Sequence, residues 1–344
     1  MNKHVYHSLT LAAAVCAAVI ANSADADPLT GRDLLKFEQK PMVNTALGGA
    51  IYFGHDELST AYGVGNTANP PLNYQGRFMA DDFADKLSSP VVHVTWWGSY
   101  INDNIAAAPQ PHVQKFLIAF ESDIPATPGG FSRPGSVITY DVVTLGALAP
   151  SSGTFTETQV RGPDPVLGEA LYKYNAELNL GHEFFQQKDT VYWLKIVALV
   201  DVAQPLPVPV PPGTTQWGWH NRDYTLQNLT ASTNVTTAPF GEFIDGNLAG
   251  QNIYHFQDDS VQGDIRFTPN APAPNDIIQL SPQPQNYVFV NSAGLGPVDG
   301  PQGIQNHSKD LAFALYTTVP EPATCLLTAM GLAGVLAIRR PRVA

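Results

Sequence analysis

Four acidic side chains in the first half of the chain could carry hydrolytic chemistry or hold a cation. Asp81 and Asp82 are adjacent, and one residue separates Glu121 from Asp123. A glycosidase needs two carboxyl groups facing each other across about 5 to 9.5 Å. Neighbouring residues of a strand point to opposite faces, so Asp81 and Asp82 can share a site only from a loop or bulge. We expect solvated loop carboxylates, with calcium binding as a second use and a hydrolase pair as the alternative.

Two aromatic groups suggest a different chemistry, the binding of sugars. Trp96, Trp97 and Tyr100 lie close together, and Trp217 and Trp219 flank a glycine. Flat ring faces can stack on the C–H surface of a sugar while nearby polar groups reach its hydroxyls. The competing interpretation is core packing, because one of two adjacent tryptophans in a strand must point inward. These five residues are the candidate glycan-binding residues.

Composition excludes several classes of site. The only cysteines are Cys16 and Cys325, near the two ends, so the body cannot build a thiol nucleophile or a cysteine zinc site. The net charge is −12, which repels nucleic acid. We expect no catalytic residue, no metal site and no cofactor. Acidic pairs such as Asp258–Asp259 leave calcium as the one cation to consider.

The N-terminus has the order of a secretory signal peptide. Lys3 precedes an uncharged apolar run from Leu9 to Ala21, and Ala24-Asp25-Ala26 follows as a small-x-small cleavage site. We therefore predict a signal peptide over residues 1–26 and an exported protein.

The C-terminus has three physical parts in a row. Pro320, Glu321 and Pro322 form a short extended motif, because each proline fixes its own φ and disfavours helix before it. Residues 323–338 carry no charge and could span about 24 Å as a helix, a little short of a ~30 Å hydrocarbon core. Arg339 and Arg340 follow, with Arg342, as a positive cluster that stays cytoplasmic.

This order, over residues 319–344, resembles the PEP-CTERM sorting signal of bacterial surface and exopolysaccharide-associated proteins. The resemblance implies that a membrane-embedded exosortase-type enzyme recognises Pro320, Glu321 and Pro322 and removes the tail. Attachment to the inner membrane is then transient, and the protein ends at the cell surface or in the extracellular matrix.

The body, residues 27–318, is expected to be all-β. The chain has 28 glycines and 29 prolines, and no long stretch outside its ends has a helical period. Short β-rich runs between turns favour an antiparallel, jelly-roll-like β-sandwich. We predict strands at residues 91–97, 115–120, 136–143, 172–178, 191–200, 253–256, 265–268, 287–290 and 311–316.

The proline-rich segment 205–213 is interpreted as a loop inside one domain, with a linker between two domains as the alternative. The body also resembles an uncharacterised β-rich domain of PEP-CTERM proteins. The matching stretches are residues 81–83, 94–100, 132–135 and 191–194. That resemblance implies a fold and no activity.

The sequence thus predicts an exported, non-enzymatic surface or extracellular-matrix protein, associated with exopolysaccharide through exposed aromatic rings. The alternatives are a secreted carbohydrate-active hydrolase on the same scaffold and a purely structural matrix protein. Exposure of the aromatic rings distinguishes a binder from a structural protein, and two carboxylates converging in a cleft would indicate a hydrolase.

Overall fold

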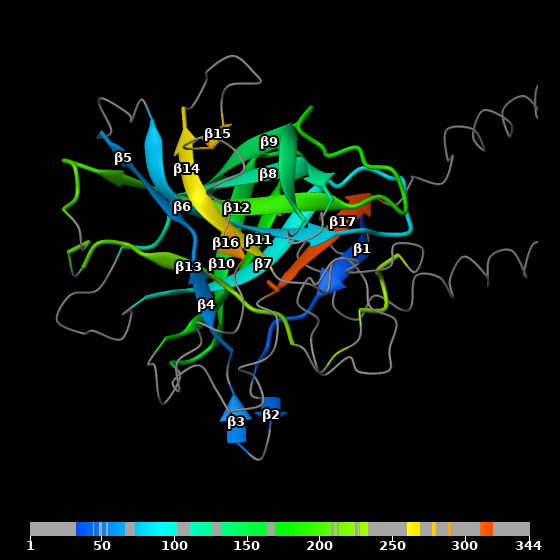
Figure 1. The fold of residues 1–344 in the computed structure, drawn as a ribbon, viewed down its shortest axis with the longest axis horizontal. Coiled ribbons are helices and arrows are strands. Elements are labelled where there is room, and N and C mark those ends of the chain that lie inside the picture. Colours follow the sequence, from blue (N-terminus) through cyan, green and yellow to red (C-terminus); the bar gives the residue numbers. More distant parts are fainter. Residues whose placement is uncertain are drawn as a thin grey trace, which may run out of the picture.

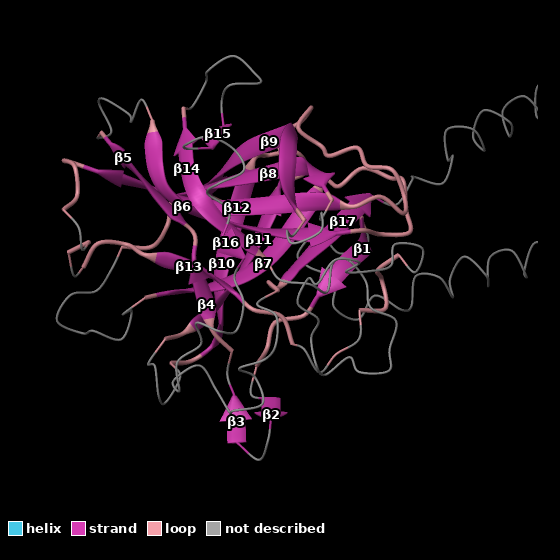
Figure 2. Ribbon diagram, viewed as in Figure 1, coloured by secondary structure: helices cyan, strands magenta, loops and turns pink. Residues whose placement is uncertain are grey.

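The computed structural model describes residues 32–43, 45–47, 50–52, 54–65, 73–101, 111–125, 132–163, 169–207, 210–211, 213–223, 226, 228–232, 260–268, 277–279, 288–289 and 310–318. These ranges contain strands and no helix (Figure 1, Figure 2), which confirms the all-β prediction. Accordingly, none of the described parts has a helix that could cross a membrane. The predicted signal peptide and sorting tail lie outside the described residues.

The strands of the described ranges are β1 (Asp33–Gln39), β2 (Thr45–Leu47), β3 (Ala50–Tyr52), β4 (Asp56–Leu58), β5 (Thr60–Val64), β6 (Tyr74–Phe83), β7 (His93–Tyr100), β8 (Lys115–Ile124), β9 (Arg133–Leu145), β10 (Thr154–Arg161), β11 (Leu171–Glu177), β12 (Tyr192–Val202), β13 (Trp217–His220), β14 (Val261–Phe267), β15 (Ile277–Gln279), β16 (Val288–Phe289) and β17 (Phe313–Thr318).

Fifteen of these strands form one sheet with the order β1-β17-β7-β11-β10-β9-β8-β12-β5-β6-β14-β15. Beside this path, β13 pairs with β4 and β7, β16 pairs with β14, and β12 also pairs with β6. Most pairs are antiparallel, as expected, but β12 runs parallel to β5, and β9 to β10. The sheet is therefore mixed, and it is not closed into a ring. Strands β2 and β3 form a separate hairpin.

The sheet folds over itself around a first core. Trp96 of β7 and Tyr174 of β11 pack in the same cluster as Phe116 of β8 and Ile196 of β12. Strands on the two sides of the fold thus bury their facing side chains against one another, as the two layers of a sandwich do.

A second core lies on the other face of β6, β8 and β12. Its walls include β9 and β14, where the rings of Tyr140 and Phe267 meet edge to face at 5.9 Å. In β12, Leu194 and Ile196 enter the first core, while Trp193 and Val197 enter the second. Burial on both faces explains why β12 is an almost continuous apolar run, and the predicted central strand is confirmed.

Sequence periodicity missed some of the strands that complete the sheet. β6 is interrupted by polar residues such as Gln75 and Arg77, yet it pairs with β5, β12 and β14.

The strands before and after the proline-rich segment 205–213 join the same sheet. β13 and β14, which follow this segment, pair with β7 and β6, which precede it. The predicted strand at 253–256 lies outside the described residues.

Candidate functional site

The candidate glycan-binding rings are part of the first core rather than of the surface. Trp96, Tyr100, Trp217 and Trp219 have no exposed surface. Trp96 stacks on Tyr174 with ring centroids 5.4 Å apart, and the indole N–H of Trp219 donates to a backbone carbonyl at 2.9 Å. A ring enclosed by other side chains cannot stack on a sugar, so the prediction for these four residues is wrong.

Trp97 points to the opposite face of β7, and it too is covered. Its side chain packs with Leu171 and Ala312, and the residue is 8% exposed. The ammonium group of Lys173 lies 5.9 Å from the ring centre. Both faces of β7 are therefore buried, which the sequence alternation could not reveal, and Trp97 offers no open platform either.

Tyr100 is the buried end of a series of hydrogen-bonded side chains that continues through Glu157 to His112 at the surface. Its hydroxyl donates to Glu157 Oε2 at 2.5 Å and accepts the backbone N–H of Val113 at 3.0 Å. Burial, together with the charge of Glu157, raises the pKa of Tyr100 above its ordinary range. His112 lies against the other oxygen of Glu157 at the surface. These contacts hold Tyr100 in place as a neutral phenol.

The acidic residues expected on solvated loops are strand residues, and three of the four are buried. Asp81 and Asp82 lie on β6 with 1% exposure, and Glu121 on β8 has none. Glu121 accepts a hydrogen bond from the ammonium group of Lys195 at 2.5 Å. Asp123 accepts one from the indole of Trp193 at 2.8 Å. The loop prediction is therefore wrong for these residues.

Asp81 and Asp82 face different cores, as adjacent strand residues must. Asp81 accepts the backbone N–H of Leu311 at 2.6 Å on the side of the first core. Burial raises the pKa of Asp81 well above its usual value, and the carboxylates of Asp310 and Asp82 add to the rise. The N–H of Leu311 and the charge of Arg222 oppose it only in part. The two carboxyl groups cannot chelate one calcium ion together.

An open groove of about 930 Å³ lies beside β5 and β6. Its lining includes Tyr62 and the ion pair between Arg77 and Asp264, whose charged atoms are 3.1 Å apart. The hydroxyl of Tyr62 donates to the carbonyl of Thr215 at 3.0 Å, and burial raises the pKa of Tyr62 to about 12. These polar groups of the groove already bind other groups of the protein.

Asp258 and Asp259, the acidic pair considered for calcium, lie outside the described residues.

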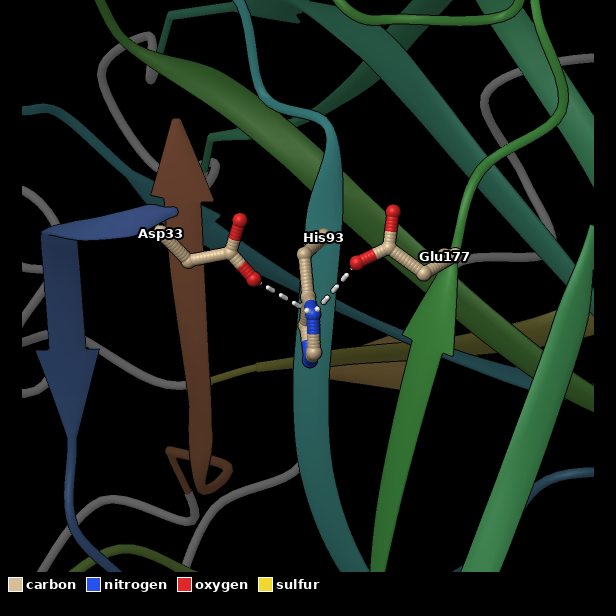
Figure 3. Close-up of side chains that lie close together, drawn as sticks. All are labelled: Asp33, His93 and Glu177. Carbon is tan, nitrogen blue, oxygen red and sulfur yellow. Dashed lines mark hydrogen bonds and ion pairs between the residues drawn. The ribbon is translucent and has the colours of Figure 1, made fainter. Parts of the chain in front are cut away.

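One cluster of side chains with ligand-type atoms was not predicted. Asp33 of β1, His93 of β7 and Glu177 of β11 meet so that one ring nitrogen faces two carboxylates (Figure 3). His93 Nδ1 lies 3.0 Å from Glu177 Oε1 and 3.1 Å from Asp33 Oδ2. The side chains of His93, Glu177 and Asp33 are 0%, 1% and 7% exposed.

Strand pairing positions this cluster. His93 is directly opposite Glu177 in the β7–β11 pair and opposite Tyr316 in the β7–β17 pair. The ring of Tyr316 meets the imidazole at 5.1 Å. Because β17 separates β1 from β7, the Asp33 side chain reaches across β17 to His93. Residues separated by 60 and 84 positions thus become neighbours, and no local spacing in the sequence signals this.

The Arg32 guanidinium neutralises both carboxylates. Its Nε donates to Asp33 Oδ1 at 2.8 Å, and a terminal nitrogen donates to Glu177 Oε1. Burial alone would raise the pKa of Asp33, but the contacts with His93 and Arg32 outweigh burial and lower it. Burial would likewise lower the pKa of Arg32, and contacts with Glu177 and Asp33 raise it instead. The cluster is therefore a charged network inside the protein.

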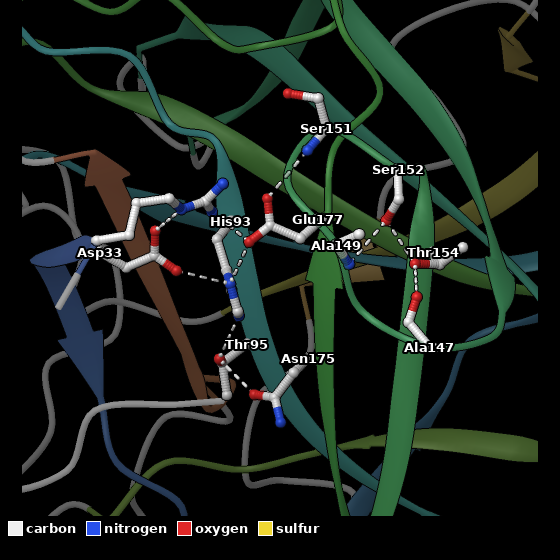
Figure 4. A network of polar contacts seen from close by, with 11 residues as sticks. Asp33, His93, Thr95, Ala147, Ala149, Ser151, Ser152, Thr154, Asn175 and Glu177 are labelled. Atoms are coloured by element: carbon white, nitrogen blue, oxygen red, sulfur yellow. Dashed lines mark hydrogen bonds and ion pairs between the residues drawn. The ribbon is translucent and has the colours of Figure 1, made fainter. Parts of the chain in front are cut away.

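Further contacts hold the imidazole ring in place (Figure 4). The hydroxyl of Thr95 donates to Asn175 Oδ1 at 2.8 Å and lies 3.5 Å from His93 Nε2. The backbone N–H of Ser151 points at Glu177 Oε2 from 3.4 Å. A ring nitrogen placed between two carboxylates can carry a proton or bind a metal ion.

Comparison with known proteins places most of this fold in a family. Residues 35–276 match the family described as a domain of unknown function (DUF7901). The chain belongs to this family. The DUF7901 match starts within β1 and covers His93 and Glu177, whereas Asp33 lies two residues before it. The prediction of an uncharacterised β-rich domain is confirmed to that extent. No curated protein and no solved structure matches this DUF7901 chain.

Proposed function

We propose that this protein is an exported, non-enzymatic component of the cell surface or extracellular matrix, with a structural role. We further propose that an exosortase-type enzyme recognises Pro320, Glu321 and Pro322 and removes the tail behind them. In this account residues 1–26 direct export, and residues 323–344 hold the precursor in the inner membrane until it is cut.

The order of the last strand and the motif is the observation that carries the proposal. β17 lies between β1 and β7 and ends at Thr318. Val319 alone separates this strand from Pro320. The last described strand therefore ends directly before the motif in the sequence. This supports a short recognition element held between a folded domain and a membrane-anchored tail.

The burial of the acidic residues supports a non-enzymatic role. The hydrolase alternative requires two carboxyl groups that a polysaccharide chain can reach. Asp81, Asp82 and Glu121 are buried, and Glu121 is paired with Lys195. We therefore do not assign the hydrolase role to them.

The burial of the five aromatic residues favours a structural protein over a polysaccharide binder that uses these rings. The net charge of −12 suits a soluble extracellular component. Any association with exopolysaccharide must therefore use other groups than Trp96, Trp97, Tyr100, Trp217 and Trp219.

The sorting part of the proposal is tested in the native host by changing Pro320, Glu321 and Pro322 together to alanine. The expected result is an uncut precursor that stays in the membrane fraction, because the recognised residues are gone. A matched control changes Pro205 and Pro207, two exposed prolines of the body, and should be processed normally. Normal processing of the motif variant contradicts the proposal.

A further inference from the structure

The Asp33–His93–Glu177 cluster has an acceptor atom that the protein itself does not fully satisfy. Glu177 Oε1 and Asp33 Oδ2 both approach His93 Nδ1, but only the contact with Glu177 is aligned as a hydrogen bond. Asp33 Oδ2 is buried, and the ion pair that it makes with the same ring nitrogen, 3.1 Å away, is not aligned as a hydrogen bond. Buried carboxylate oxygens normally have such a partner. A cation that contacts both oxygens at once would satisfy this atom.

We propose that Asp33, His93 and Glu177 form a binding site for a divalent transition-metal ion of the zinc type. The ion would take the place of the Nδ1 proton and of the Arg32 guanidinium. His93 would supply Nδ1, and Asp33 and Glu177 would supply one carboxylate oxygen each.

The distances are close to those that such an ion needs. Zinc bonds to imidazole nitrogen and carboxylate oxygen are about 2.0 to 2.2 Å long and tetrahedral, so two ligand atoms of one ion are separated by roughly 3.3 to 3.6 Å. The separations from Nδ1 to the two carboxylate oxygens are 3.0 and 3.1 Å. The three ligand atoms lie within 4.8 Å of one another, and both carboxylates point toward the imidazole ring (Figure 3), so small side-chain shifts would bring them around one ion.

The contacts at Nε2 of His93, the ring nitrogen away from the carboxylates, favour the tautomer that a metal at Nδ1 needs, with the hydrogen on Nε2. The single hydroxyl proton of Thr95 goes to Asn175, so Thr95 Oγ1 can only accept from His93 Nε2. A hydrogen on Nε2 leaves the Nδ1 lone pair for the ion. Such contacts to the second ring nitrogen are typical of metal-bound histidine. An imidazole ligand also distinguishes this site from a calcium site, which prefers oxygen alone.

Charge and position make Arg32 a competitor of the metal. Two carboxylates carry two negative charges, which Arg32 and a protonated imidazole balance in the same way as one divalent ion. The Arg32 side chain is 26% exposed at the start of β1, so it can leave toward solvent. Removing its charge should therefore strengthen metal binding, whereas it would weaken a network made only of ion pairs.

The experiment is a titration of the purified, EDTA-treated full chain with Zn²⁺ at pH 7.5 by calorimetry, with Co²⁺ absorption as a second readout. We expect one equivalent of Zn²⁺ to bind. His93→Ala and Asp33→Asn each remove a ligand, so they should weaken binding by more than the roughly 10- to 100-fold that the loss of an outer-shell partner costs. Arg32→Gln should tighten binding, and Ca²⁺ should not compete.

His112→Ala is the matched control, because it removes another imidazole–carboxylate pair, with Glu157, away from this cluster. It should leave the affinity for Zn²⁺ unchanged. The proposal is overturned if the wild-type chain binds no stoichiometric Zn²⁺, or if His93→Ala and Asp33→Asn bind it as tightly as the wild type. Should His93→Ala not fold, Asp33→Asn and the Co²⁺ spectrum of the wild-type chain decide the question.

Discussion

Trp217 donates its indole N–H to the hydroxyl of Tyr174, 3.1 Å away in the first core. Tyr174 in turn stacks on Trp96 with an angle of 9° between the rings. Tyr174 thus joins Trp217 of β13 to Trp96 of β7, two of the rings that the sequence had suggested for sugar binding. Burial raises the pKa of Tyr174 well above its usual value, with Tyr100 and Glu157 adding to the rise, so the phenol stays a donor and acceptor without charge.

The first prediction concerns the stability contributed by these rings. Trp217→Ala should lower the free energy of unfolding by about 3–5 kcal/mol, because it leaves a cavity in a packed core. Phe185→Ala, at a ring that is 71% exposed, should change it by less than about 0.5 kcal/mol. Chemical denaturation measures both. A Trp217→Ala protein as stable as the wild type would show that the ring is not packed in the core.

A second prediction concerns the close approach of β13 to β7. A Cβ atom on Gly98 would lie 2.3 Å from the carbonyl oxygen of Gly218 and 2.4 Å from the ring of Trp217. Gly98→Ala should therefore destabilise the protein by about 1–3 kcal/mol through overpacking. Gly162→Ala is the control, since a Cβ there meets nothing within 4 Å, and it should be nearly neutral. Equal melting temperatures for the two variants would contradict this packing.

A third prediction concerns a buried charge on the first strand. The register of β1 against β17 shifts between Leu35 and Phe37, and this bulge aims Lys36 inward. The Lys36 ammonium lies 3.5 Å from Asp85 Oδ2, and neither side chain is exposed. Burial lowers the pKa of Lys36, opposed in part by Asp85, and burial raises the pKa of Asp85, opposed in part by Lys36.

Lys36→Met should destabilise the protein by about 3–5 kcal/mol, because it leaves the Asp85 carboxyl buried without its cation. Combining it with Asp85→Leu should recover most of that loss, since an apolar pair of similar size needs no counter-charge. Denaturation of the two single variants and the double variant gives the coupling. If the two losses simply add, Lys36 and Asp85 do not form an interacting pair.

The fourth prediction is a pH dependence that arises from Asp81. Its folded-state pKa is raised by burial and by Asp310, so the folded protein holds a proton that the unfolded chain releases near pH 4. The stability linked to this group is complete below that pH and is lost as the pH rises toward the folded-state pKa. Asp81→Asn cannot ionise, so its stability relative to wild type should increase between pH 4 and pH 8. Parallel pH profiles of the two proteins would refute the assignment.

The sequence predicted the elements whose pattern is local. The apolar runs of β8 and β12 and the alternation of β11 and β17 were found because burial imposes those patterns directly. β6 was missed because Asp81 and Asp82 resemble loop residues until neighbouring strands cover them.

The candidate functional residues were less predictable than the strands. Trp96 and Trp97 alternate as strand residues should, but only the sheet order shows that both faces of β7 are covered. Asp33, His93 and Glu177 come together through the register of β1, β17, β7 and β11. Such long-range pairing leaves no trace in residue spacing, so a sequence motif could not have predicted this cluster.

The proposed function is tested most directly by mass spectrometry of the terminal peptides of the protein recovered from the surface or medium of its native host. The account predicts a mature chain that starts at Asp27 and ends close to Pro320–Pro322, without Arg339 and Arg340. A surface protein that retains the peptide over residues 323–344, or that still begins with Met1, would contradict export with removal of the sorting tail.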